Sequence, residues 1–161
     1  MQLNLEELVK AFAEVSALAG IHLDAEELRT ELLPAPHARP SSLPIGTQAV
    51  YAFICGQGCL KVGKAGPKTQ ARFTSQHYGS NAPSTLAKSI IRGRSRMLAL
   101  VTPAARAEFE TLDISSVGGW LERNTSRFHL FLPASAPGYA LTLAEGFVQC
   151  RFRPIYEGKG S

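Results

Sequence analysis

The stretch VYAFICGQGCLKVGKAG, residues 50–66, predicts the centre of the fold. Residues 49–54 contain the β-branched and aromatic side chains that favour strands, and residues 59–63 form a second short apolar run. The glycines on both sides of Gln57 tolerate the positive φ angles of a tight hairpin turn. We therefore expect two antiparallel strands joined by a turn near Gln57.

The segments after this hairpin predict an α+β fold within the broad α/β class. Apolar spacing, caps and prolines predict four helices and one strand, over residues 68–77, 84–92, 103–113, 141–154 and 127–133 respectively. Ser84 is the expected N-cap of its helix. Because a hairpin joins the first two strands, no crossover helix separates them, and the order β-β-α-α-α-β-α predicts a small mixed or antiparallel three-stranded sheet flanked by helices.

The N-terminal third predicts a helical appendage and a linker. Apolar residues recur at helical spacing over residues 3–19, which end at Gly20. Residues 24–33 predict a second helix, with Asp24 as N-cap and a glutamate three residues later. Residues 34–47 are rich in proline and serve as a linker. We expect an acidic helical pair over residues 1–33 and the main domain over residues 48–158.

The composition is that of an ordinary globular chain. The 161 residues are 45% hydrophobic and 19% charged, which is enough to form a core. No apolar run approaches the roughly 20 residues of a membrane-spanning helix, and the N-terminus lacks the basic start of a signal peptide, so we expect a cytoplasmic protein with no membrane partner. Three cysteines are too few for a disulfide framework, and Cys55 with Cys59 would make only half a zinc site, so we expect both in the core or hairpin.

The net charge of +4 is distributed unevenly. Residues 1–33 contain two basic and seven acidic residues and carry a net charge of −5, and the rest of the chain carries +9. A domain this basic is typical of proteins that bind a polyanion such as nucleic acid. Charge alone leaves open a surface of solvated lysines and arginines.

Four residues are candidates for chemistry. Tyr51 and Lys61 have the same parity about the hairpin turn, so we expect them close together, where an ammonium group can lower the pKa of a phenol and make it a proton acceptor. Arg72 has the fork of donors that binds a phosphate. Glu145 serves either a metal or a helix cap with Thr142, and the spacing favours the cap. A core tyrosine, a solvated lysine and an exposed arginine are the alternatives for the other three.

Taken together, the segments AVYAFI, LKVGKAG, ARFTSQHYG, LERNTSRFHLFLP and LAEGFVQCRFRPIYEG resemble the GIY-YIG nuclease family over residues 48–158. The resemblance implies the small fold of that family and a metal-dependent phosphodiesterase that acts on DNA. Ala49-Val50-Tyr51 matches the first motif, and Lys61-Val62-Gly63 matches the second with a lysine in place of the second tyrosine.

Four further residues or pairs of residues match or replace positions of the family motifs. Arg72 matches the arginine of the family and Glu145 its metal-binding glutamate. His77 and Tyr78 lie near the position of the histidine or tyrosine that follows the arginine in the family. Residues 156–157 replace its late asparagine.

The resemblance implies a hydrolytic mechanism. Tyr51, assisted by Lys61, would activate a water that attacks a DNA phosphate in line with the leaving 3′ oxygen, and Arg72 would stabilise the phosphate. Glu145 would hold one divalent cation, Mg²⁺ or Mn²⁺, whose other ligands are water and the phosphate.

Further basic residues are expected to bind the DNA backbone without reading its sequence. They are Lys64, Lys88, Arg92, Arg94, Arg96 and Arg127.

Two function classes stay open. The first is an endonuclease that acts on single- or double-stranded DNA. The second is a catalytically inactive DNA-binding module on the same fold, which would bind DNA with or without metal and never cut it. The N-terminal helices could form a homodimer, recruit a partner, cover the basic domain or pack as a simple appendage.

Overall fold

The computed structural model describes residues 4–82 and 85–157. This part of the chain contains four strands, six α-helices and three short 3₁₀ helices. The strands are β1 (Arg29–Leu33), β2 (Thr47–Cys55), β3 (Gly58–Ala65) and β4 (Ser126–Pro133). The α-helices are α1 (Leu5–Leu18), α2 (Gln70–Thr74), α3 (Leu86–Arg92), α4 (Pro103–Thr111), α5 (Val117–Asn124) and α6 (Gly138–Phe152). The 3₁₀ helices are η1 (Ala25–Glu27), η2 (Gln76–Tyr78) and η3 (Arg94–Met97).

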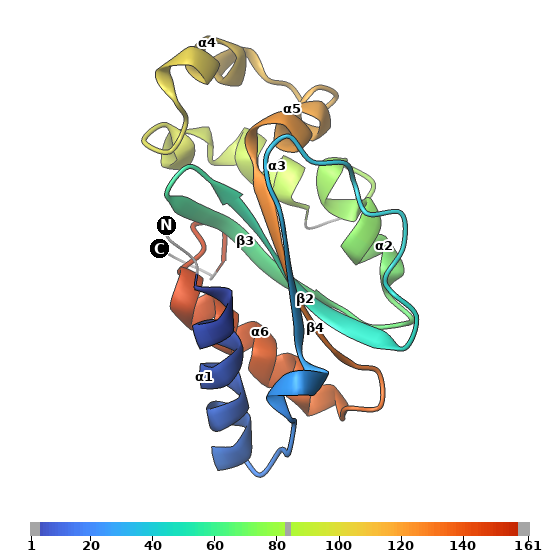
Figure 1. Cartoon of the computed structure of the whole chain (residues 1–161). Coiled ribbons are helices and arrows are strands. Elements are labelled where there is room, and N and C mark those ends of the chain that lie inside the picture. Colours follow the sequence, from blue (N-terminus) through green and yellow to red (C-terminus); the bar gives the residue numbers. More distant parts are fainter. Residues whose placement is uncertain (1–3, 83–84, 158–161) are drawn as a thin grey trace.

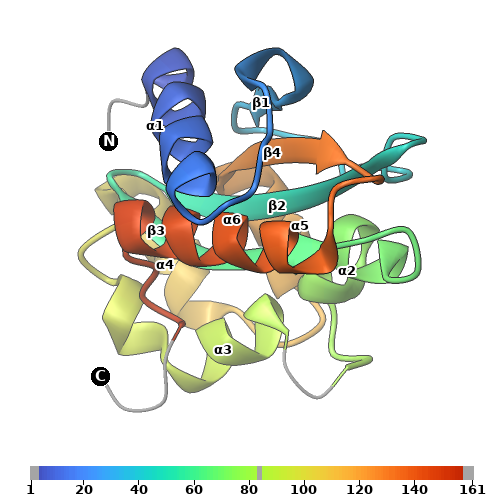
Figure 2. The ribbon, with the colours of Figure 1, turned by 90° about the horizontal axis from the view of Figure 1, so that it is seen from below.

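The sheet has four antiparallel strands in the order β1-β4-β2-β3. The predicted hairpin is confirmed as β2 and β3, with Gly56 at φ +54° in the turn. Three strands were expected, and the prediction is wrong because the fourth strand comes from the N-terminal segment. Figure 1 shows β2, β3 and β4 in one twisted layer, and Figure 2 shows β1 beside β4.

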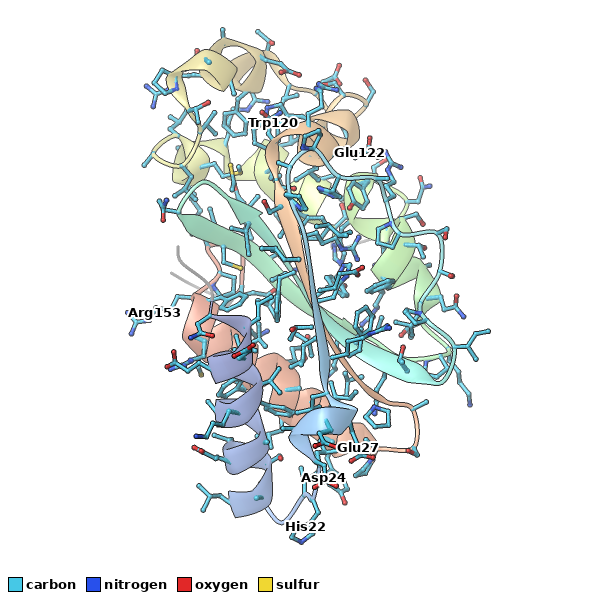
Figure 3. The ribbon with its side chains drawn as sticks, viewed as in Figure 1. His22, Asp24, Glu27, Trp120, Glu122 and Arg153 are labelled. Carbon is cyan, nitrogen blue, oxygen red and sulfur yellow. The ribbon has the colours of Figure 1, made fainter. Side chains whose placement is uncertain are left out.

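The helix predicted over residues 24–33 is wrong. Its cap contact does form, because the Glu27 carboxylate accepts a hydrogen bond from the Asp24 amide at 3.1 Å, and Figure 3 shows the two residues side by side. The helix nevertheless ends after the single turn of η1, and β1 follows at once. Strand β1 pairs with β4 from Arg29, opposite Phe131, to Leu33, opposite Arg127. Tertiary pairing overrides the local helix signal here.

The helices cover both faces of the sheet. Figure 1 shows α2, α3, α4 and α5 on one face and α1 with α6 on the other, and Figure 2 shows α1 and α6 side by side. Successive residues of β2 alternate between the two cores, since Tyr51 and Phe53 join Trp120 of α5, whereas Val50 and Ala52 join the core under α1 and α6. Figure 3 labels Trp120, which is fully buried.

The helix predictions succeed where the local signals are strong. The helix predicted over residues 3–19 is confirmed as α1, which Asn4 caps, and Gly20 follows it at φ +73°. The helix over residues 103–113 is confirmed as α4, and that over residues 141–154 is confirmed as α6, which starts three residues earlier at Gly138.

The other helix predictions need correction. The helix over residues 68–77 is shorter than expected, because α2 ends at Thr74 and η2 follows. Ser84 lies outside the described residues, and the Thr85 hydroxyl caps α3 by accepting a hydrogen bond from the Lys88 amide at 3.2 Å. Helix α5 was not predicted, since its two glycines disfavour a helix. Gly118 is required there because a Cβ at this position would lie 2.5 Å from the Tyr78 carbonyl oxygen.

The N-terminal segment is packed into the fold. Leu8 and Phe12 of α1 are buried against α6 and the sheet. The segment expected as a linker is irregular before β2, yet His37 and Leu43 in it are also buried. A homodimer through α1 stays a prediction, and it would need a face other than the one that holds Phe12. Within residues 4–82 and 85–157, no helix combines the length and apolar character needed to cross a membrane.

Phe12→Ala is expected to lower the free energy of unfolding of the whole protein. The ring is fully buried and lies 5.5 Å from the Phe147 ring, centroid to centroid, so the substitution leaves a cavity that costs about 3–5 kcal/mol. Urea denaturation measures the effect. Leu18→Ala, at a side chain that is 90% exposed on the same helix, is the control and should change the stability by less than about 0.5 kcal/mol. A main transition unaffected by Phe12→Ala would mean that α1 is a separate appendage.

Candidate active site

A pocket of about 320 Å³ opens beside the outer strand β3, between α2 and η2 on one side and α6 on the other. It brings together six of the predicted site residues, which come from β2, β3, α2, η2 and α6. Its lining consists of Tyr51, Lys61, Val62, Gly63, Lys64, Arg72, Gln76, His77, Glu145 and Glu157.

The hairpin register positions the first two candidates. Tyr51 pairs with Gly63, and Lys61 pairs with Phe53, the next residue of β2 on the same face. The predicted proximity of Tyr51 and Lys61 is therefore confirmed as a diagonal relation across the hairpin. A Cβ on Gly63 would lie 2.6 Å from the Tyr51 hydroxyl oxygen. Glycine is needed at this position because the tyrosine ring lies over it.

His77 holds the hydroxyl of Tyr51. The His77 Nε2 atom lies 2.6 Å from the Tyr51 oxygen, and the Leu86 amide donates a hydrogen bond to His77 Nδ1 at 3.3 Å. Because Nδ1 accepts, the neutral ring carries its proton on Nε2 and donates it to Tyr51. Burial, together with the nearby charges of Lys61, Arg127 and Arg72, lowers the pKa of His77 to about 3, so the ring stays neutral.

Tyr51 is a neutral phenol at physiological pH. Burial raises its pKa above the usual value near 10, as do Glu145 and Glu157, and Arg127 and Arg72 only partly oppose the shift. The predicted lowering of this pKa by Lys61 is therefore wrong, because desolvation outweighs the nearby cations. The cation with the largest opposing effect is Arg127, a core residue.

Each lysine of the pocket pairs with a carboxylate. Lys61 Nζ lies 3.0 Å from Glu157 Oε1, and Lys64 Nζ lies 2.9 Å from Glu145 Oε2. Lys64 also donates a hydrogen bond to the Thr142 hydroxyl at 2.9 Å. The helix cap predicted for Thr142 and Glu145 is wrong, because α6 starts at Gly138 and both residues lie inside it. Glu145 instead faces the pocket from α6.

Glu145 fits the role of a metal ligand only in part. Carboxylate oxygens are the donors that Mg²⁺ and Mn²⁺ prefer, and a single carboxylate with water is a common arrangement for Mg²⁺. The described residues contain no group of three or more metal-ligating side chains, so water and substrate would have to supply most of the ligands. Glu157 is a second carboxylate in the same pocket. A hard cation at Glu145 would have to compete with Lys64 for this carboxylate.

The two hairpin cysteines do not share a site. Cys55 belongs to the core under α5 and Cys59 to the core under α6, on opposite faces of the sheet. Burial raises the pKa of Cys55 to about 11 and that of Cys59 to about 12, so both stay neutral thiols.

Tyr78 and Arg127 lie behind the pocket rather than in it. Arg127 is fully buried and donates a hydrogen bond to the Tyr78 hydroxyl at 3.1 Å. Tyr78 in turn lies 2.8 Å from His37 Nε2, and His37 Nδ1 lies 2.7 Å from the Thr125 carbonyl oxygen. The prediction that Arg127 binds DNA is wrong, because a buried guanidinium has no access to a phosphate. The position of Tyr78 also speaks against direct catalysis by its hydroxyl.

The other predicted DNA-binding residues differ in their surroundings. Lys88 donates a hydrogen bond to the Ala82 carbonyl at 2.6 Å, and Arg96 donates one to the Ile155 carbonyl at 3.3 Å. Arg94 donates to the carbonyls of Glu110 and Leu112, at the end of α4. These contacts give the three residues a structural use. Arg92 is exposed at the end of α3, and Lys64 alone of the six lines the pocket.

Glu157 was not predicted as a site residue. The only sequence signal for it is its place near the late asparagine of the resembled family. The segment before it packs along β3, since the Ile155 amide donates to the Cys59 carbonyl and the Tyr156 amide to the Leu60 carbonyl, each at 3.0 Å. These hydrogen bonds hold the chain along β3, so that Glu157 lies next to Lys61.

Gly63→Ala is expected to displace the Tyr51 ring, because the new methyl group would overlap the hydroxyl oxygen. The overlap should cost about 1–3 kcal/mol of stability. It should also break the hydrogen bond to His77, which the ring nitrogen chemical shifts of His77 report in an NMR spectrum. Gly66→Ala is the matched control, since open space surrounds its Cβ position. Unchanged His77 shifts in Gly63→Ala would contradict the close packing of Tyr51 on Gly63.

Acid pH is expected to destabilise the fold in part through His77. Its pKa is about 3 in the folded protein and about 6.5 in an unfolded chain, so the unfolded chain binds an extra proton between these values. The free energy of unfolding therefore falls as the pH decreases from about 6.5 toward 3, by up to about 1.4 kcal/mol per pH unit for this group.

The His77→Gln variant tests this expectation by urea denaturation at several pH values in that window. In this variant the free energy of unfolding should fall less steeply with decreasing pH than in wild type. A part of the pH dependence should remain, because burial also lowers the pKa of His129 to about 3. His22→Gln makes the same change at an exposed histidine and serves as the control for the substitution itself. An equal slope in wild type and His77→Gln would show that His77 is not buried as a neutral ring.

No family model, curated protein or solved structure matches the chain. The likeness to the GIY-YIG nucleases therefore rests on the motif residues and their order along the chain.

Proposed function

We propose that the protein is a metal-dependent DNA endonuclease of the GIY-YIG type. The observation that carries the proposal is the convergence of Tyr51, Lys61, Arg72, His77 and Glu145 in one pocket. Five separate elements contribute one of them each.

The charges of the pocket favour an anionic substrate. Lys61, Lys64 and Arg72 supply three positive charges, and Glu145 and Glu157 supply two negative ones. Arg72 can bind two oxygens of a phosphodiester and stabilise the charge that develops on them during attack. The net charge of +9 on residues 34–161 gives the wider surface an attraction for the DNA backbone.

Tyr51 acts as the base in its ionised form. Its proton leaves to solvent, and the phenolate then accepts a proton from the attacking water. The water oxygen bonds to phosphorus while the bond to the 3′ oxygen breaks, and that oxygen takes a proton from solvent. His77 stabilises the phenolate by donating from Nε2, and it cannot relay the proton because Nδ1 already accepts from Leu86.

Glu145 would hold the divalent cation, which supplies Lewis-acid stabilisation of the phosphate when bound. Lys64, freed from Glu145, can then bind a phosphate oxygen. Lys61 holds a fixed position beside Tyr51 through its pair with Glu157.

One observation favours the second candidate, a DNA-binding module without cleavage. Lys64 already neutralises Glu145 at 2.9 Å, which lowers the attraction of this carboxylate for a cation. A protein in which that pair persists would bind DNA through its basic residues and leave it intact.

Incubation of the purified protein with supercoiled plasmid, and separately with labelled single-stranded DNA, tests the proposal. Cleavage is expected with Mg²⁺ or Mn²⁺ and not with EDTA. Glu145→Gln and Tyr51→Phe should each lower the rate by about 100-fold or more, because each removes a group that acts in the transition state.

Two matched variants control for unspecific effects. Glu14→Gln makes the same change at an exposed carboxylate of α1, and Tyr139→Phe removes the hydroxyl of an exposed tyrosine. Both should cut as wild type does. Cleavage that persists in EDTA or in Glu145→Gln would refute the metal-dependent mechanism, and a mobility shift without cleavage under every condition would support the binding module.

A further inference from the structure

We propose that Arg127 is a buried positioning residue whose guanidinium stabilises negative charge on Tyr51. The inference rests on the proposed function, because it assigns Arg127 a part in the reaction at the same site. Arg127 does not touch substrate in this scheme and acts through the tyrosine alone.

The position of Arg127 is costly without such a use. Its side chain has 0% exposure, and no described carboxylate forms an ion pair with it. Its Nε atom also has no hydrogen-bond partner among the described residues. Burial of an unpaired charge is strongly unfavourable, and replacement of buried ions by apolar residues of similar volume often stabilises a protein. Its hydrogen bonds to the Phe73 carbonyl and the Tyr78 hydroxyl offset only part of this cost.

The guanidinium lies among four aromatic rings. The distance from its central carbon to the ring centroid is 5.2 Å for Tyr51, 5.0 Å for Phe53, 4.8 Å for Phe73 and 5.9 Å for Tyr78. A neutral ring attracts a cation through its quadrupole. A phenolate attracts it more strongly, because the negative charge is delocalised over the ring. Of these four rings only Tyr51 also lines the pocket.

Two hydrogen bonds fix the guanidinium in place. Arg127 donates to the Phe73 carbonyl and to the Tyr78 hydroxyl. Tyr78 is held in turn by His37, so the cation cannot swing away from Tyr51. The bonds therefore keep a fixed positive charge on the core side of the Tyr51 ring, whereas Lys61 and Arg72 belong to the lining of the pocket.

Other charged or titratable groups also face Tyr51 and Arg127. Lys61 and Arg72 face Tyr51 from the pocket, His77 holds its hydroxyl, and Glu145 and Glu157 oppose its ionisation. The groups around Arg127 are Tyr78, Glu31, His37 and His129. Arg127 is the largest favourable influence on the ionisation of Tyr51. It is also protected from solvent screening by its burial.

The test is Arg127→Met in the full chain, with fluorotyrosine at position 51. The fluorine NMR shift follows the ionisation of this tyrosine directly, without DNA or metal. Loss of the cation should move the titration to higher pH by one unit or more, and plasmid cleavage at neutral pH should fall by about tenfold or more. The rising limb of the pH–rate profile should move in the same direction. Thermal stability is a separate readout and should fall, because the Phe73 carbonyl and the Tyr78 hydroxyl lose a hydrogen-bond donor.

Three further variants complete the design. Arg127→Lys keeps the charge and should retain a titration close to that of wild type. Arg127→Gln, which also removes the charge but keeps a polar side chain, replaces the methionine variant if that protein does not fold. Arg29→Met is the matched control, since Arg29 stacks on Phe131 at 4.6 Å but is exposed and absent from the surroundings of Tyr51.

The outcomes separate this inference from the proposed function. A titration and pH–rate profile unchanged by loss of the Arg127 charge, with lower thermal stability, would overturn the inference and leave cleavage by Tyr51 and Glu145 intact. A shifted titration in a protein that never cuts DNA would support the electrostatic effect of Arg127 and refute the nuclease.

Discussion

Strand β2 is hydrogen-bonded along both edges and buried on both faces, and the rest of the structure depends on its register. It pairs with β3 on one side and β4 on the other. Because side chains alternate, Tyr51 and Phe53 belong to one core, and Val50 and Ala52 to the other. A slip of one residue would turn Tyr51 away from His77 and place it under α6. Close packing of both cores therefore fixes the geometry of the pocket as well as the fold.

A polar network crosses the core that lies behind this pocket. Hydrogen bonds run from Arg127 to Tyr78, then to His37 and the Thr125 carbonyl. His37 comes from the irregular segment before β2, so the network also ties that segment to the sheet. Such networks are costly to bury and are tolerated when nearly every member is satisfied. In the proposed reaction its charged end lies next to the residue that must ionise, which gives a functional reason for the cost.

The pocket itself balances its charges before any ligand enters. Lys61 is paired with Glu157 and Lys64 with Glu145, which leaves Arg72 as the remaining cation of the lining. Under the proposed function, a divalent cation would take the Glu145 carboxylate and a phosphate would take the freed ammonium group of Lys64, while the pair of Lys61 and Glu157 stays in place. Burial keeps Tyr51 protonated until then, so the free pocket does not hold a reactive base.

The sequence by itself determined the elements whose signals are local. The hairpin, α1, α4, α6 and β4 follow from apolar period, caps, glycine and proline, and the motif residues Tyr51, Lys61, Arg72, His77 and Glu145 can be identified from the chain alone. Tertiary structure decided what depends on distant partners. Residues 29–33 form a strand because their backbone pairs with β4, and Gly118 of α5 lets this helix approach the Tyr78 carbonyl closely. It also placed Arg127 in the core and Glu157 in the pocket, and it keeps Tyr51 protonated. Burial and charges from distant parts of the chain decide these three features, and neither can be inferred from a local pattern of residues.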